Sequence, residues 1–116
     1  MRVKRVNPAE RKGWYAGPWN SDLTIAVGYA NEGIDAPHLH RRITEVYLVA
    51  RGWSEARVER ETVQPQAGDV LIVEPGESHS FLASSPDYFR FVVRVPGLPP
   101  EEARADHASV PHSRLA

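Results

Sequence analysis

The feature that most restricts the fold is a series of short segments in which apolar side chains alternate, each followed by residues that favour a turn. Leu23–Ala30, Thr44–Arg51 and Tyr88–Val95 are the clearest of them. Successive side chains of an extended strand point to opposite faces, so this period of two is typical of strands with a buried face. We expect further short strands near residues 3–6, 36–40, 54–61, 70–73 and 79–83. About eight strands, with helix limited to one turn near 101–104, predict an all-β sandwich or barrel.

Thr44–Arg51 is unusual among these segments because both of its faces are largely apolar. Tyr47 and Val49 lie on one face with Glu45, while Val46 and Leu48 lie on the other. A strand with two apolar faces is expected to be covered on both sides. We therefore predict that it lies inside a sandwich or barrel whose outer face is also packed.

The composition excludes several classes of protein. A chain of 116 residues is one domain with room for a core. A net charge of −1 argues against a dedicated nucleic-acid binder. The absence of cysteine excludes disulfides, thiolate zinc sites and cysteine nucleophiles. The longest aliphatic run, Val70–Val73, is far shorter than a membrane span, so we expect a cytoplasmic protein with neither nucleic-acid nor membrane partners.

One segment carries several metal-binding side chains at a useful spacing. His38 and His40 are two residues apart, which on a β-strand aims both imidazoles at one point. On a helix they would point about 200° apart and could not share an ion. Glu45 follows after a gap that allows a turn and the start of a second strand. The segment therefore predicts half of a metal site, on an antiparallel pair of strands.

Together with a later segment, these residues resemble the cupin family, which consists of small metal-binding barrels of the jelly-roll kind. The first cupin motif corresponds to Gly33, His38, His40, Glu45 and Gly52. The second corresponds to Gly68–His79, which contains Pro75-Gly76 before the histidine. The spacing departs slightly from the family pattern before His38 and at the proline, but no ligand position is affected. The resemblance implies one double-stranded β-helix domain over 1–116, with a conserved barrel at about 22–95, an irregular N-terminal arm at 1–20 and a tail at 96–116.

The resemblance implies that His38, His40, Glu45 and His79 bind one divalent transition metal ion. Three imidazoles and one carboxylate suit Mn, Fe, Ni, Co or Zn, and the ligand set does not choose among them. The remaining histidines, His107 and His112, lie in the tail and receive no role. The alternative is that the three barrel histidines are ordinary core or surface residues, as in cupins that have lost their metal.

An open coordination position would distinguish a ligand-binding or catalytic metal from a structural one. We expect a small oxygen-rich substrate, such as a sugar, keto acid or catechol, undergoing isomerisation, decarboxylation or dioxygen chemistry. The alternative is a non-catalytic domain that binds a small ligand as a sensor or store. The family resemblance also implies a homodimer formed through sheet edges, with the arm able to swap between subunits. Candidate pocket residues, from strand parity or from a shared strand face, are Tyr47, Phe81, Phe91, Arg90 and Arg94.

Overall fold

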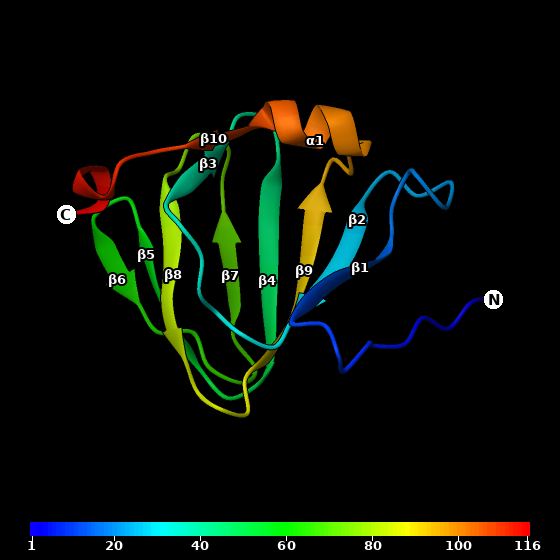
Figure 1. The fold of residues 1–116 in the computed structure, drawn as a ribbon, viewed down its shortest axis with the longest axis horizontal. Helices are drawn as coiled ribbons and strands as arrows, with labels where there is room; N and C mark the ends of the chain where they lie inside the picture. Colours follow the sequence, from blue (N-terminus) through cyan, green and yellow to red (C-terminus); the bar gives the residue numbers. More distant parts are fainter.

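The computed structural model describes residues 1–116 and contains two antiparallel five-stranded sheets (Figure 1). The first sheet contains, in spatial order, β1 (Lys12–Ala16), β2 (Ala26–Ala30), β9 (Phe89–Val95), β4 (Thr44–Arg51) and β7 (Val70–Val73). The second contains β10 (His107–Ser109), β3 (His38–His40), β8 (His79–Ser84), β5 (Ser54–Val58) and β6 (Glu61–Val63). The all-β prediction is confirmed.

Side chains from both sheets meet in one apolar core. Tyr47, Val73 and Val92 come from the first sheet, and Ala56 and Phe81 come from the second. The rings of Tyr47 and Phe81 meet edge to face with centroids 5.0 Å apart, a favoured arrangement for an aromatic pair. This core joins the two sheets and reaches the cluster through Tyr47, whose hydroxyl donates to Glu45.

Glycines make two of the turns that the motifs require. Gly52 ends β4 with a φ of 69°, and a Cβ there would come within 2.1 Å of the Ser85 hydroxyl oxygen. Gly76 has a φ of 85° in the turn before His79. Side chains other than hydrogen are strained at such positive φ values, which explains the glycine at both places.

The terminal segments contain more regular structure than the sequence predicts. The first strand is β1 at Lys12–Ala16, inside the expected arm, and not the segment near residues 3–6. The tail contains helix α1 (Pro100–Asp106), strand β10 and a short 3-10 helix, η1 (His112–Leu115). Pro100 and two acidic residues in the first turn favour the start of α1. Neither helix is long and apolar enough to cross a membrane.

The outer face of the first sheet is apolar and exposed. Leu48 of β4 is paired with Val70 on one side and Phe91 on the other, and their side chains are 37%, 54% and 38% exposed. Ile72 is also 54% exposed. The prediction that β4 is covered on both faces is therefore wrong for the single chain, because its outer side chains have no covering layer.

Candidate metal centre

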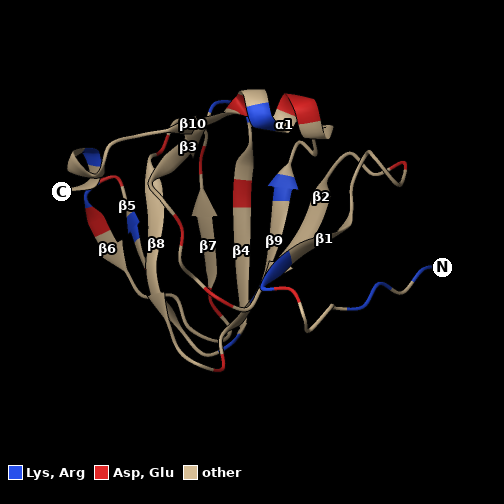
Figure 2. Ribbon diagram, in the orientation of Figure 1, with Lys and Arg blue, Asp and Glu red and all other residues tan.

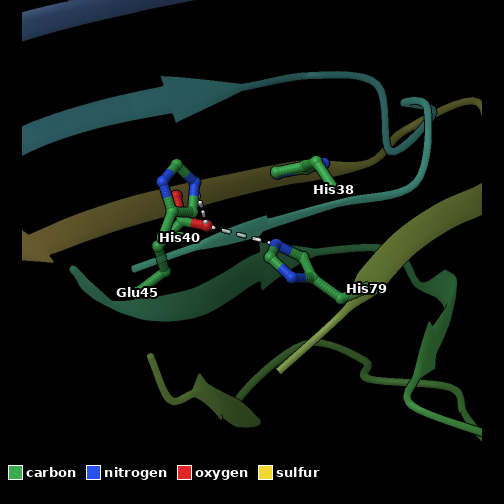
Figure 3. A group of neighbouring side chains, drawn as sticks. All are labelled: His38, His40, Glu45 and His79. Carbon is green, nitrogen blue, oxygen red and sulfur yellow. Dashed lines mark hydrogen bonds and ion pairs between the residues drawn. The ribbon is translucent and has the colours of Figure 1, made fainter. Parts of the chain in front are cut away.

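The four predicted ligand residues meet at one end of the barrel. His38 and His40 lie on β3, Glu45 is the second residue of β4, and His79 is the first residue of β8. Each offers one ligand atom, and these atoms all lie within 4.8 Å of one another (Figure 3). His40, Glu45 and His79 are buried, with exposed fractions of 3%, 3% and 1%. The structure thus brings together residues from both sheets that are up to 41 positions apart in the sequence.

Backbone pairing explains how the two cupin motifs come into contact. His38 and His79 face each other as the paired residues of β3 and β8. The Gly76 amide, in the turn before β8, donates a hydrogen bond of 2.7 Å to the His40 carbonyl oxygen. The glycine turn of the second motif is therefore fixed to the strand of the first.

The Nδ1 atom of each of the three imidazoles faces a nearby acceptor. His38 Nδ1 donates to the Ala36 carbonyl oxygen at 2.8 Å, and His79 Nδ1 donates to the Glu77 carbonyl oxygen at 3.0 Å. His40 Nδ1 lies 3.3 Å from Asp106 Oδ2. Metal-binding histidines commonly use one nitrogen in this way, which fixes the ring and leaves the other nitrogen for the ion.

Glu45 is the most strongly connected residue of the cluster. Its Oε1 atom lies 3.2 Å from Nε2 of both His40 and His79, and it accepts a hydrogen bond of 2.8 Å from the Tyr47 hydroxyl. Its Oε2 atom accepts one of 3.1 Å from Arg94 Nε. Burial alone would raise the pKa of Glu45, but the two imidazoles and the guanidinium outweigh it and hold that pKa well below its usual range. Glu45 is therefore a carboxylate, as a metal ligand must be.

The residues present fit a metal ion. Both ring nitrogens of His40 are buried and neither makes an aligned hydrogen bond, although each lies near a carboxylate. Buried polar atoms without partners are rare and call for an explanation. A cation between Nε2 of His40 and the other ligand atoms would satisfy the side of the ring that faces the cluster. Imidazole and carboxylate donors suit a divalent transition metal.

Two residues of the site come from the tail and were not predicted. Strand β10 pairs with β3, which places His107 opposite His40. The His107 ring stacks on His38 with centroids 4.8 Å apart and 17° between the planes. Burial and the nearby His40 lower the pKa of His107. Asp106, buried at the end of α1, faces His40 and also accepts a hydrogen bond from the Arg42 amide at 2.7 Å.

A cavity of about 570 Å³ adjoins the cluster, and the structure places the five predicted pocket residues differently around it. Tyr47, Arg90 and Arg94 line the cavity together with His38, Glu45 and His107. Phe81 is buried in the core beneath them. Phe91 lies on the outer, exposed face of β9, so its predicted place in the pocket is wrong. The physical reason is that Arg90, Val92 and Arg94 occupy the inner face of that strand.

Arg90 is the least expected of these lining residues. Its side chain is 9% exposed, and its guanidinium lies 4.7 Å and 4.1 Å from the ring centroids of Tyr47 and Phe81. The Nε and Nη1 atoms have no hydrogen-bond partner. The aromatic rings stabilise the cation in place of a carboxylate. Figure 2 shows the basic end of β9 beside the single acidic residue of β4, and of the two arginines of β9 only Arg94 pairs with Glu45.

Comparison with known structures supports the fold. Streptomyces PAC13, solved as a variant with uridine, superposes with a TM-score of 0.69 at 18% identity, over 86% of this chain and 77% of that one. A conserved Klebsiella pneumoniae protein with a double-stranded β-helix domain gives 0.56 at 26% identity, over 75% and 73%. A predicted oxalate decarboxylase from Thermotoga maritima gives 0.52 at 26% identity, over 64% and 65%.

The sequence itself matches a family model. No curated protein matches the chain. The model of the AraC-like ligand-binding domain matches residues 23–114, which is most of the chain and includes every residue of the cluster. The chain therefore belongs to the AraC-like ligand-binding domain family, within the cupin superfamily.

Proposed function

We propose that the protein binds one divalent transition metal ion through His38, His40, Glu45 and His79, and that a small oxygen-rich metabolite binds beside it. The observation that carries the proposal is the convergence of four ligand atoms within 4.8 Å, with each imidazole Nδ1 facing an acceptor. The donor set suits Mn, Fe, Co, Ni or Zn. When bound, such an ion polarises the oxygen atoms of its ligand.

The charge of the cavity favours an anionic metabolite. Lys12, Arg90 and Arg94 line it, against the carboxylates of Asp35 and Glu45. Glu45 is already paired with Arg94, whereas two nitrogen atoms of Arg90 have no partner. A buried cation without an anion is costly, and a ligand carboxylate would supply the missing charge. Among sugars, keto acids and catechols, keto acids fit this arrangement best.

Catalysis is the form of this function that we favour. PAC13 is described as a nucleoside dehydratase, and the Thermotoga maritima relative as a predicted oxalate decarboxylase, so similar barrels act on small oxygen-rich molecules. The reactions that we propose are isomerisation, decarboxylation or dioxygenation. The pocket residues would then bind and orient the substrate, while the buried Tyr47 hydroxyl and Arg94 would keep the Glu45 carboxylate in position.

The second candidate is a non-catalytic ligand sensor or store, which the family match favours because it describes a ligand-binding domain. The two functions differ in what happens to the bound molecule. A sensor releases its ligand unchanged, whereas an enzyme converts it at a rate proportional to the metal content of the sample.

Elemental analysis of the purified protein, followed by incubation with keto acids, sugars and catechols, tests the proposal. We expect about one equivalent of a transition metal in the wild type and in His112→Ala, and much less in His79→Ala. His112 is a suitable control because it lies in η1, away from the cluster. Equal metal content in all three proteins would contradict the metal site. Unchanged ligand in the presence of full metal would favour the sensor.

We also propose that the chain forms a homodimer and that a second copy covers the outer face of the first sheet. Val46, Leu48, Val70, Ile72 and Phe91 lie there on neighbouring strands. Contiguous exposed apolar side chains on a small domain are typical of an interaction surface. The sheet edge at β7 lies next to the same surface, which is consistent with a contact that includes a sheet edge.

A further inference from the structure

A second cavity, separate from the one beside the metal cluster, lies between helix α1 and the first sheet. Its volume is about 340 Å³. Six of its eight lining residues are apolar, and they include Trp14, Trp19, Ile43, Leu98 and Ala103. A cavity of about 150 Å³ with apolar walls is enough to hold benzene. This cavity therefore has room for a ring or a branched aliphatic group.

Two tryptophans form one wall of this cavity and are only partly packed. Trp14 and Trp19 are 42% and 41% exposed, and their rings meet edge to face with centroids 6.0 Å apart. Each ring lies over a glycine: a Cβ on Gly28 would come within 2.7 Å of Trp14, and one on Gly17 within 2.2 Å of Trp19. The rings are thus held in place while much of their apolar surface stays exposed.

The two cavities meet at one pair of side chains. Trp14 and Arg94 line both of them. The Arg94 guanidinium lies 4.6 Å from the centre of the Trp14 ring and donates to Glu45 on its other side. This pair therefore lies between the two cavities, and a small molecule that reaches across it would touch the metal cluster with one end and the tryptophan wall with the other.

The charges around the junction show which end carries the oxygens. The tryptophan cavity contains Arg94 as its only charged residue. Arg94 is already paired with Glu45, whereas the cavity beside the cluster also presents Lys12 and the unpartnered Arg90. An anionic group is therefore favoured on the side of the metal cluster, and an uncharged group in the tryptophan cavity.

We infer that the ligand of this protein is a small carboxylate that also carries an apolar group, and that the cavity under α1 binds the apolar group. The inference rests on the proposed metal-dependent binding and adds the class of substrate. The carboxylate and its neighbouring oxygen bind in the cavity beside the cluster, which His38 and Arg90 line. The apolar group lies against Trp14 and Trp19, beneath Ala103.

The test uses Co²⁺-loaded protein, whose visible absorption changes when a ligand binds at the metal. The two probes are pyruvate and phenylpyruvate, which share the chelating 2-oxo acid and differ in the apolar group. In the wild type we expect phenylpyruvate to bind at least about tenfold more tightly, because a phenyl ring leaves water. In Trp19→Ala we expect the ratio of the two Kd values to fall below about threefold.

Trp53→Ala is the matched control, since Trp53 is 38% exposed and lines none of these cavities. The tenfold preference should persist in it. Ala103→Phe, which fills the cavity from a partly exposed helix position, should abolish the preference in a folded protein even if Trp19→Ala proves unstable.

The test distinguishes a failure of this inference from a failure of the proposed function. Equal affinity for both probes in the wild type, or an unchanged ratio in both variants, overturns this inference and leaves the metal centre standing. If Co²⁺ does not bind, or pyruvate leaves its spectrum unaltered, the proposed function fails and the inference fails with it.

Discussion

The Nδ1 atom of His40 lies 3.3 Å from the Oδ2 atom of Asp106, so a residue of the tail faces the back of a predicted metal ligand. Both groups are buried. The carboxylate orients the ring and favours the tautomer with a free Nε2. The tail therefore contributes to the candidate metal centre without supplying one of the four proposed ligands.

Replacing Asp106 should weaken metal binding while leaving the four ligands in place. Asp106→Asn keeps an oxygen to accept the Arg42 amide but loses the charge that faces His40. We expect metal affinity to fall about 10- to 100-fold, measured by competition with a coloured chelator. Asp69→Asn, which alters an exposed turn where Asp69 accepts the Gln66 amide, should leave the affinity unchanged. Equal affinities in both variants would contradict the role of Asp106.

Metal removal should lower the thermal stability of the wild type. An ion that binds only the folded state stabilises it by about 2.7 kcal/mol at a free concentration of 100 times its Kd. A chelator should therefore lower the Tm by several degrees, measured by calorimetry. In His79→Ala the chelator should have little effect. The same loss of Tm in both proteins would show that the stabilising ion binds elsewhere.

Metal affinity should fall as the pH decreases. Without metal, His79 donates from Nδ1 to Glu77 and from Nε2 to Glu45, which requires both nitrogens to carry protons. Burial alone would lower the pKa of His79, but these hydrogen bonds outweigh it and raise the pKa above the usual value of 6.5. The proton competes with the ion below that raised pKa. The metal affinity is therefore highest above the raised pKa of His79, and it is lost as the pH falls through that pKa.

Calorimetric metal titrations in two buffers with different ionisation heats test whether the metal ion displaces protons. They should show protons released on binding near neutral pH, and an affinity that falls about tenfold per pH unit below the raised pKa. Because the pKa of Glu45 is low, protonation of that carboxylate does not add to the pH dependence of metal affinity over the same range. An affinity that stays constant between about pH 5.5 and 8 would contradict proton displacement.

Arg90→Met should leave stability unchanged or raise it by about 1 kcal/mol, because it removes a buried cation that has no carboxylate partner. It should also weaken the binding of pyruvate to the metal-loaded protein by about tenfold or more. Denaturant unfolding and calorimetric titration measure the two effects. Arg51→Met is the matched control, because Arg51 lies 5.5 Å from the Phe89 ring, outside the cavity. Unchanged pyruvate affinity would exclude Arg90 as an anion partner.

A charge on the outer face of the first sheet should dissociate the proposed homodimer. We expect the wild type to sediment as a dimer at micromolar concentration and Ile72→Glu as a monomer. Leu82→Glu should remain dimeric, because Leu82 is 47% exposed but belongs to β8 of the second sheet. A monomeric wild type would remove the proposal.

The pair His38 and His40 was predictable because its spacing is a local signal, whereas the resemblance to the cupin family was needed to add His79 and complete the proposed ligand set. The two-residue spacing of His38 and His40 requires a strand, and the glycines before and within the second motif place turns around β7. Strand β10 gave no such signal: His107-Ala108-Ser109 is short and lacks apolar alternation, so its pairing with β3 depends on tertiary contacts. Asp106 and His107 were missed for this reason.

The inner face of β9 was misread because an apolar face is expected to point inward. Here Phe91 and Val95 point outward, and Arg90 and Arg94 point into the barrel. The residues that explain why the arginines point inward belong to the neighbouring strand. Ala30 and Ala26 of β2 pair with these arginines, and their small side chains leave room for them. Such cross-strand fitting cannot be read from one strand alone.

The place of β10 in the second sheet also sets the order in which the centre can form. The last of the four ligands, His79, is synthesised well before the residues that pair with β3 and face His40. During translation, the ligand set is therefore complete while His40 still lacks the carboxylate behind it. For the proposed ion, full affinity would then require Asp106 to have left the ribosome and docked behind His40, which would make metal capture a late event in the biosynthesis of this barrel.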